Sequence, residues 1–208
     1  MIRLALPKGR NQQPVVEALR AAGLSLSALD NGERKLLLPC PEDGFELLLI
    51  KGWDVPRYVE HGVADLGVVG SDVLEEVGGD LLVPLRFRAG RSRFCLIGPP
   101  GSQPQPGSQV RLATKYPETA RRALREQPWG AEILELSGSI ELAPLLDLAD
   151  IALDIVQTGR TLKENHLVEL ETVKEVADCL VVNRASFQQH RAVVNDLIAR
   201  LESAEVVL

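Results

Sequence analysis

The sequence predicts an α/β fold in which the strands are mostly parallel. Short β-branched or leucine-rich runs alternate with amphipathic segments along the whole chain, as they do in α/β proteins. Hydrophobic residues make up 45% of the chain and charged residues 25%, which is typical of a globular protein with an ordinary core. The 208 residues suffice for one large domain or two small ones, since domains usually run to ~100–150 residues.

The first half of the chain alternates strands with capped helices. A helix over 14–22 presents its apolar residues on one side and stops at Gly23. A second helix begins at Asp54 as its N-cap, carries Pro56 in its first turn and ends at Gly62. We expect strands at 2–6, 35–38, 46–50 and 66–69.

The second half repeats this arrangement after a loop over 99–107, whose Pro, Gly, Ser and Gln residues favour turns. Its expected strands are 94–97, 110–113, 132–136 and 151–156, and its expected helices are 117–126 and 141–146. Apolar residues at helical spacing over 186–203 predict one closing amphipathic helix. An Ala-Asp pair precedes a strand and a glycine in both halves, at 64–70 and 149–159, an echo that is too short to prove duplication.

Charge and composition exclude several classes of function. The net charge of −6 and the aromatic content of 4% give neither the basic surface nor the stacking platforms of a nucleic-acid-binding protein. No apolar run reaches the ~20 residues of a membrane span, and the amino terminus does not have the pattern of a signal peptide, so we expect a cytoplasmic protein without membrane association. Cys40, Cys95 and Cys179 lie far apart without a CxxC pair, so we expect buried, reduced thiols rather than disulfides or a zinc site.

The segment over 154–162 carries the clearest chemistry. A strand ends there in hydroxyl and glycine residues, and a polar helix start follows. Free backbone N–H groups at such a turn point at an anion, Gly159 permits close approach, and Thr158 and Thr161 add donors. Asp154 is placed to accept hydrogen bonds from ribose hydroxyls. The alternative is a strand–turn–helix junction that caps a helix and binds nothing.

Two more segments place cations after strands, where open α/β sheets bind their ligands. Lys8, Gly9 and Arg10 follow the first strand and would meet a phosphate or a nucleotide. Lys115 follows the strand over 110–113 and is a candidate phosphate contact, with a solvated lysine as the alternative.

Several blocks together resemble the ATP phosphoribosyltransferase family, and the resemblance covers about residues 1–200. In chain order these blocks are LPKGR at 6–10, DVPRYVE at 54–60, ADLGVVGSD at 64–72, ATKYP at 113–117, LSGSIELAP at 136–144, LAD at 148–150, DIVQTGRTL at 154–162 and VNR at 182–184. The resemblance implies transfer of the phosphoribosyl group of phosphoribosyl pyrophosphate (PRPP) to N1 of the adenine of ATP. Pyrophosphate would be released, with substrate-bound Mg²⁺ as cofactor and no protein metal site. This is the first step of histidine biosynthesis.

The resemblance also implies roles for individual residues. Arg34 and Lys51 would be catalytic through their grip on pyrophosphate, although many relatives carry Arg at the position of Lys51. PRPP would be bound by Asp154, Gln157, Thr158, Gly159, Arg160 and Thr161. ATP or pyrophosphate would be bound by Lys8, Gly9, Arg10, Asp72, Lys115 and Glu141, and Asp72 could equally be a first-turn acid that favours the helix dipole.

The sequence shows no obvious general base, and since the adenine nitrogen is itself the nucleophile, positioning and stabilisation of the leaving group can suffice. The histidines show no metal-ligand spacing, and His166 stands where many relatives have glycine.

The implied fold has two lobes like the periplasmic-binding-protein type II fold, with mixed sheets flanked by helices and the active site in the cleft between lobes. We expect lobe I over 1–89 and 180–208, and lobe II over 90–179 with the 5′-phosphate loop. Short members of this family work with a regulatory subunit that resembles a class II aminoacyl-tRNA synthetase and binds histidine, in a hetero-octamer built on catalytic homodimers. The alternatives are a non-catalytic bilobed sensor for a phosphorylated ligand and a phosphoribosyltransferase for another base.

Overall fold

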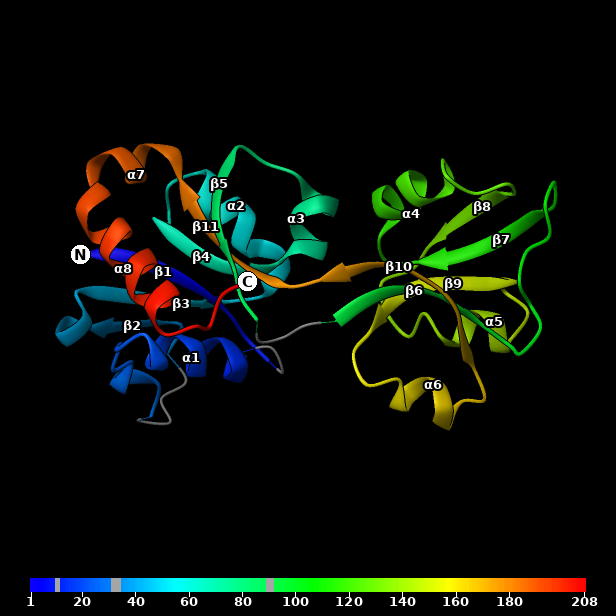
Figure 1. Cartoon of the computed structure of the whole chain (residues 1–208), viewed down its shortest axis with the longest axis horizontal. Helices are drawn as coiled ribbons and strands as arrows, with labels where there is room; N and C mark the ends of the chain where they lie inside the picture. Colours follow the sequence, from blue (N-terminus) through cyan, green and yellow to red (C-terminus); the bar gives the residue numbers. More distant parts are fainter. Residues whose placement is uncertain (10–11, 31–34, 89–91) are drawn as a thin grey trace. The chain divides into compact units, whose positions relative to one another are not determined.

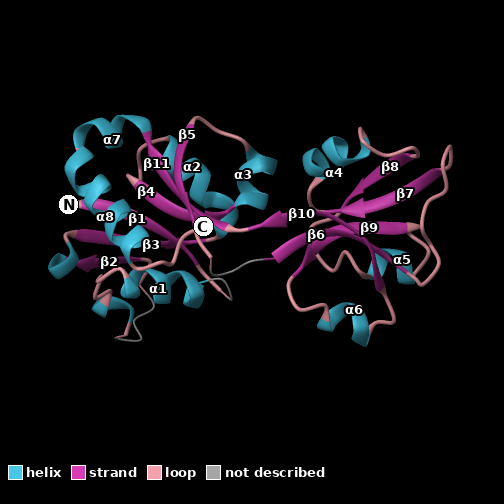
Figure 2. Ribbon diagram, viewed as in Figure 1, coloured by secondary structure: helices cyan, strands magenta, loops and turns pink. Residues whose placement is uncertain are grey.

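The chain forms two compact α/β units, which a computed structural model describes for residues 1–9, 12–30, 35–88 and 92–208. Unit 1 comprises Met1–Gly90 and Ala177–Leu208, and unit 2 comprises Arg91–Val176. Both units contain strands and helices (Figure 2). Across the described part of the chain, no helix has both the length and the apolar character needed to cross a bilayer.

Unit 1 is built on a six-stranded mixed sheet in the order β2-β3-β1-β4-β11-β5. Strand β1 pairs in parallel with β3 and β4, whereas β2, β11 and β5 run antiparallel to their neighbours. The strands are β1 (Ile2–Pro7), β2 (Leu37–Cys40), β3 (Phe45–Ile50), β4 (Leu66–Gly70), β5 (Leu81–Arg86) and β11 (Asp178–Asn183). The expected mixed sheet is therefore confirmed in this unit.

Helices cover both faces of this sheet (Figure 1). Because side chains alternate along a strand, Leu4 and Leu6 of β1 pack with Leu19 of α1 and Leu197 of α8, while Ala5 packs on the opposite face against α2 and α3. The helices are α1 (Gln12–Ala21), α2 (Val55–Glu60), α3 (Ser71–Val77), α7 (Arg184–Gln189) and α8 (Arg191–Ser203), with short 3-10 turns η1 (Ser27–Leu29), η2 (Pro41–Asp43) and η3 (Gly52–Asp54).

Unit 2 is a smaller sandwich around a five-stranded mixed sheet in the order β10-β6-β9-β7-β8. One side of the sheet is parallel, since β7 pairs in parallel with β8 and β9, whereas β6 is antiparallel to both β9 and β10. Helices α5 and α6 lie on one face and α4 on the other (Figure 1). The elements are β6 (Ser92–Gly98), β7 (Gln109–Thr114), α4 (Pro117–Leu124), β8 (Gly130–Glu135), α5 (Leu142–Leu145), β9 (Ile151–Val156), α6 (Arg160–Glu164) and β10 (Val168–Val176).

The Ala-Asp echo of the sequence marks the same hydrogen-bonded clamp in both units. In unit 1 the carboxylate of Asp65 accepts from the N–H of Arg3 at 2.8 Å, and the N–H of Asp65 donates to the carbonyl of Arg3 at 2.9 Å. In unit 2 Asp150 makes the same two bonds with Arg111, at 2.7 and 2.9 Å. Each clamp ties the start of one parallel strand to its neighbour, which fixes the register of the pair.

Two expectations about the elements were wrong. The strand expected at 35–38 is β2, over Leu37–Cys40, because its pairing with β3 sets its position and its edge location accepts Pro39. The single closing helix is instead the pair α7 and α8, which is interrupted at His190, whose φ of −120° is not helical. The side chain of Asn183 caps α7 by accepting the N–H of Ser186 at 3.0 Å, so the first helix starts directly from β11.

The thiols lie where we expected them. Cys40, Cys95 and Cys179 are all free and buried. Burial raises the pKa of Cys95 and of Cys179 to about 11 each, so neither thiol ionises near neutral pH.

Candidate functional site

The carboxyl ends of the three parallel strands in unit 2 bring several candidate residues to one edge of the sheet. Lys115 follows β7, Glu141 lies in the segment after β8, and Gln157 follows β9. The backbone register aligns Thr114 with Leu153, which leaves Lys115 and Asp154 as the next positions on the two strands. Open α/β sheets bind their ligands at this kind of edge.

Asp154 is half-buried at this edge, and its ionisation responds to the other candidates. Its pKa is raised to about 6, chiefly by burial, and the negative charge of Glu141 acts in the same direction. The N–H of Ile155, which donates to the Asp154 carboxylate at 2.8 Å, and the positive charge of Lys115 both act in the opposite direction. Three residues from three separate segments therefore share one electrostatic environment.

The loop between β9 and α6 has the conformation expected of an anion-binding turn. Gly159 has φ 70°, a left-handed conformation that L side chains rarely adopt, and α6 begins at the next residue. The N–H of Arg160 donates weakly to the hydroxyl of Thr158 at 3.4 Å, and the Arg160 side chain pairs with Glu164 at 2.7 Å while remaining 83% exposed. The side chains of Thr158 and Thr161 are exposed, so the loop presents its hydroxyls to solvent.

Thr114 holds the exit of β7 in place, a role that the sequence analysis missed. Its buried hydroxyl donates to the carbonyl of Leu153 at 2.8 Å and accepts from the N–H of Tyr116 at 2.9 Å. Lys115 lies between these anchors, so its backbone is fixed relative to β9. The ATKYP block contains this threonine, but nothing in its letters distinguishes a structural hydroxyl from a ligand.

Unit 1 has a corresponding edge at the carboxyl ends of β1, β3 and β4. The N–H of Lys8 donates to the carbonyl of Ile50 at 2.8 Å, which brings Lys8 beside Lys51, and both lysines are exposed. Gly9 has φ 99° and open space around its Cα. Arg10 and Arg34 lie outside the described residues. The described part of this edge thus carries two cations that could hold phosphate as point charges.

Asp72 lies below the surface at the same edge. It is 8% exposed, and its carboxylate folds back over Gly70 at the start of α3. The neighbouring Asp178 of β11 is 3% exposed, and its Oδ2 has no hydrogen-bond partner. Burial first, and the charge of Asp72 second, raise the pKa of Asp178 to about 7.

A group of potential metal ligands in unit 1 does not fit Mg²⁺. Cys40, Glu42 and Asp43 lie close together, but Asp43 already accepts the N–H groups of Ser25 and Leu26 at 2.8 Å each. Glu42 accepts the hydroxyl of Ser27, and Mg²⁺ favours oxygen over sulfur ligands. These residues fasten η1 to η2.

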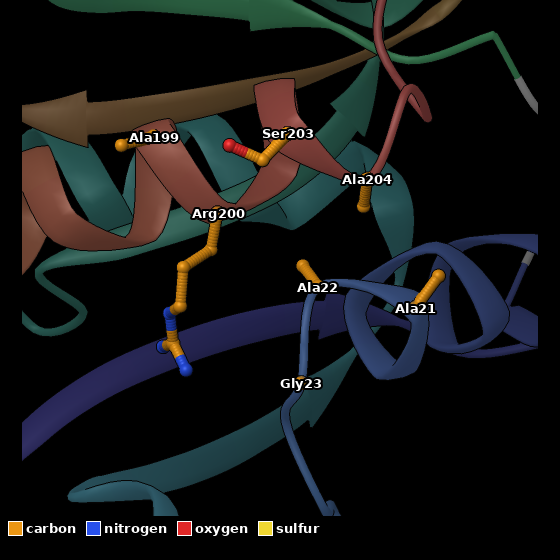
Figure 3. A pocket seen from close by; sticks show the side chains of 7 residues that line it. All are labelled: Ala21, Ala22, Gly23, Ala199, Arg200, Ser203 and Ala204. Carbon is orange, nitrogen blue, oxygen red and sulfur yellow. The ribbon is translucent and has the colours of Figure 1, made fainter.

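A surface hollow also lies in unit 1, where the end of α1 approaches α8 (Figure 3). Small residues line most of it, and the Arg200 side chain extends from α8 along its rim. None of the lining residues was predicted as a site residue. They are Ala21, Ala22, Gly23, Ala199, Arg200, Ser203 and Ala204.

Comparison of the chain with known proteins identifies its family. Residues 51–203 match the family model HisG, described as ATP phosphoribosyltransferase. The chain belongs to the ATP phosphoribosyltransferase family. A curated ATP phosphoribosyltransferase of Geobacillus kaustophilus (strain HTA426) is 45% identical over 201 residues, which are 97% of each protein.

Solved structures agree with this family and with the fold class. The ATP phosphoribosyl transferase (HisG:HisZ) complex from Thermotoga maritima contains a chain that is 36% identical, with a TM-score of 0.81 and coverage of 98% of this chain and 97% of that one. A putative sulfonate ABC transporter periplasmic sulfonate-binding protein from Methylobacillus flagellatus KT has a TM-score of 0.62 at 9% identity, covering 98% of this chain and 67% of that chain. The second likeness concerns fold alone, and the expected resemblance to periplasmic binding proteins is confirmed.

Proposed function

We propose that this member of the ATP phosphoribosyltransferase family transfers the phosphoribosyl group of PRPP to N1 of the adenine of ATP, the first step of histidine biosynthesis. The observation that carries the proposal is the convergence of Lys115, Glu141 and Asp154 beside the Gly159 loop in unit 2. Phosphate, ribose and nucleotide need different contacts, and this edge offers a cation, carboxylates and a left-handed turn with exposed hydroxyls.

The reaction breaks the bond from ribose C1′ to the pyrophosphate oxygen and forms a bond from C1′ to adenine N1. Because N1 brings its own lone pair, positioning and stabilisation of the leaving group can suffice without a general base. In this proposal Gln157, Thr158, Gly159, Arg160 and Thr161 hold the 5′-phosphate. Asp154 would accept hydrogen bonds from the ribose hydroxyls, since a pKa of about 6 leaves its carboxylate mostly ionised above neutral pH.

The cations of unit 1 fit the pyrophosphate and the nucleotide. Lys51 and Arg34 would stabilise the leaving group, and Lys8, Gly9 and Arg10 would contact ATP or pyrophosphate. Lys51 supplies a point charge where an arginine would bind bidentately, so its grip depends less on the orientation of the phosphate. For Asp72 a role through α3 fits its burial better than direct contact with substrate.

Mg²⁺ would be carried mainly by oxygens of the substrates. The carboxylate of Asp154 and the hydroxyls of the loop fit the rim of such a complex, and the ion would supply charge neutralisation at the pyrophosphate. No Mg²⁺ site made of protein ligands alone is proposed.

The proposal includes a regulatory partner and a division into lobes. We place lobe I at 1–89 and 180–208 and lobe II at 90–179, with substrates held by residues of both. We further propose a cytoplasmic catalytic homodimer that associates with a regulatory subunit resembling a class II aminoacyl-tRNA synthetase, in a hetero-octamer. The solved relative in a HisG:HisZ complex supports this partner.

Pyrophosphate release from ATP, PRPP and Mg²⁺ tests the proposal, with and without the regulatory subunit. The variant Arg160→Ala with Thr161→Ala should lose most of the turnover. Arg121→Ala is the matched control, because Arg121 is likewise exposed and paired within its helix, to Glu118, in the same unit. PRPP binding without turnover, both with and without the regulatory subunit, would contradict the enzyme proposal and favour a sensor for a phosphorylated ligand.

A further inference from the structure

An ion pair between two strands of unit 2 lies against the loop between β9 and α6. Arg93 of β6 binds Glu169 of β10 through both ends of its guanidinium, with 2.9 Å between Nε and Oε2 and a shorter contact between Nη2 and Oε1. Both side chains are about one-third exposed, at 32% and 30%. Two parallel hydrogen bonds fix the orientation of the guanidinium as well as its charge.

The pair contacts the loop at two points. Nη1 of Arg93 donates a long hydrogen bond, 3.5 Å, to the carbonyl of Gln157, the first residue after β9. Oε1 of Glu169 lies 3.5 Å from the position that a Cβ would occupy on Gly159. The thiol of Cys95 donates to Oε2 of Glu169 at 3.4 Å from the buried side. Glu169 is thus held between the sheet and the loop.

The charges of this pair matter for a loop that binds phosphate. The guanidinium of Arg93 lowers the pKa of Glu169, so the carboxylate is ionised at neutral pH. An unpaired carboxylate at this distance from Gly159 would repel the phosphate. With Arg93 in place the two charges cancel, and Arg93 also anchors the start of the loop.

We propose that Arg93 is a positioning residue for PRPP, acting through the Gln157–Thr161 loop, and that Glu169 orients it. Arg93 does not touch the substrate in this inference. It holds the Gln157 carbonyl so that the loop N–H groups face outward, and it neutralises Glu169. The inference rests on the proposed function, because it takes this loop as the site of the PRPP 5′-phosphate.

The test compares Arg93→Met, Arg93→Met with Glu169→Gln, and Arg93→Lys by steady-state kinetics. In Arg93→Met we expect the KM for PRPP to rise about tenfold, because the Glu169 carboxylate is no longer neutralised and repels the phosphate. The kcat and the KM for ATP should change less than about twofold. The double variant should recover most of the loss, because it removes the repelling charge. Arg93→Lys keeps the charge without the fork and should fall between wild type and Arg93→Met.

Arg111→Met is the matched control. Arg111 makes an equivalent forked pair with Asp150 in the same unit, at the amino ends of the strands, away from the loop. It should lower the melting temperature without raising the KM for PRPP. Equilibrium binding of PRPP to Arg93→Met, with near-ultraviolet circular dichroism of the same sample, separates loss of the loop from loss of the fold.

The outcomes distinguish the two proposals. Wild-type protein without ATP- and PRPP-dependent turnover would remove the proposed function itself. Normal wild-type turnover combined with an unchanged KM for PRPP in Arg93→Met, or with an equal rise in Arg111→Met, would overturn the positioning role alone. A double variant as impaired as the single one would also overturn the electrostatic half of the inference.

Discussion

The buried carboxyl of Asp178 should make the protein less stable as pH rises. The chain releases this proton near pH 3.8 when unfolded, but in the folded protein the pKa is about 7. At pH values between these two pKa values the folded state binds more protons than the unfolded state, so the free energy of unfolding falls with rising pH. The shift of about three pKa units corresponds to about 4 kcal/mol, at roughly 1.4 kcal/mol per unit.

The substitution Asp178→Asn should remove this loss. Asparagine has the same shape, carries no charge, and can donate a hydrogen bond to the adjacent carboxylate of Asp72. Relative to wild type, the variant should gain about 2–3 kcal/mol between pH 5 and pH 7, within the pH range that the raised pKa spans. Above pH 8 the difference should become constant.

Urea unfolding at several pH values measures this difference in unit 1. The protein has two tryptophans, Trp53 in unit 1 and Trp129 in unit 2, so a Trp129→Phe background leaves Trp53 as the reporter of the relevant unit. Asp196→Asn is the control, because the Asp196 side chain is 68% exposed and its removal should change stability by less than about 0.5 kcal/mol. A stability difference for Asp178→Asn that does not vary with pH would refute the reasoning.

Substitutions at three further positions test local geometry. Thr114→Val should cost about 2–4 kcal/mol in the free energy of unfolding, because it leaves the Leu153 carbonyl and the Tyr116 N–H without their buried partner, whereas Thr114→Ser should cost much less. Gly159→Ala has space for its methyl group but must adopt φ 70°, so it should cost about 1–2 kcal/mol and weaken PRPP binding, with Gly159→Asn milder in calorimetry. His166→Gly should stabilise the protein by up to ~1 kcal/mol, since His166 has φ 55°, and an unchanged or lower melting temperature would contradict this.

The sequence predicts the elements whose pattern is local. Strand β9 occupies the expected 151–156, and the turn signals at Gly159 and Asp54 mark real helix starts. The edge strand β10 was missed because two register irregularities interrupt the alternation of apolar and polar residues along Val168–Val176, which is too polar to resemble a buried strand. The interruption at His190 was missed because apolar residues continue at helical spacing on both sides of it.

Some features of the candidate site can be read from the sequence, and others depend on the folded sheet. Residues that directly follow strands, such as Lys115 and Gln157, could be marked as ligand candidates from the sequence, whereas their meeting at one edge depends on the strand order of the folded sheet. The pairing of Arg93 with Glu169 could not, because it joins residues 76 positions apart through the pairing of β6 with β10. The raised pKa of Asp178 depends on burial in the completed sheet, and no property of its sequence neighbours indicates it.

The aspartate clamps at the starts of the parallel strands constrain how the length of each strand can change. In unit 2 the clamp joins Arg111 to Asp150, and Lys115 and Asp154 each lie four residues further along, at the ligand edge. An insertion of one residue after the clamp would leave it closed but would turn Lys115 to the opposite face of the sheet, away from Asp154. The number of residues between the clamp and the ligand edge is therefore fixed on both strands. Variation in length should be confined to loops such as 99–107, which lie outside these two segments.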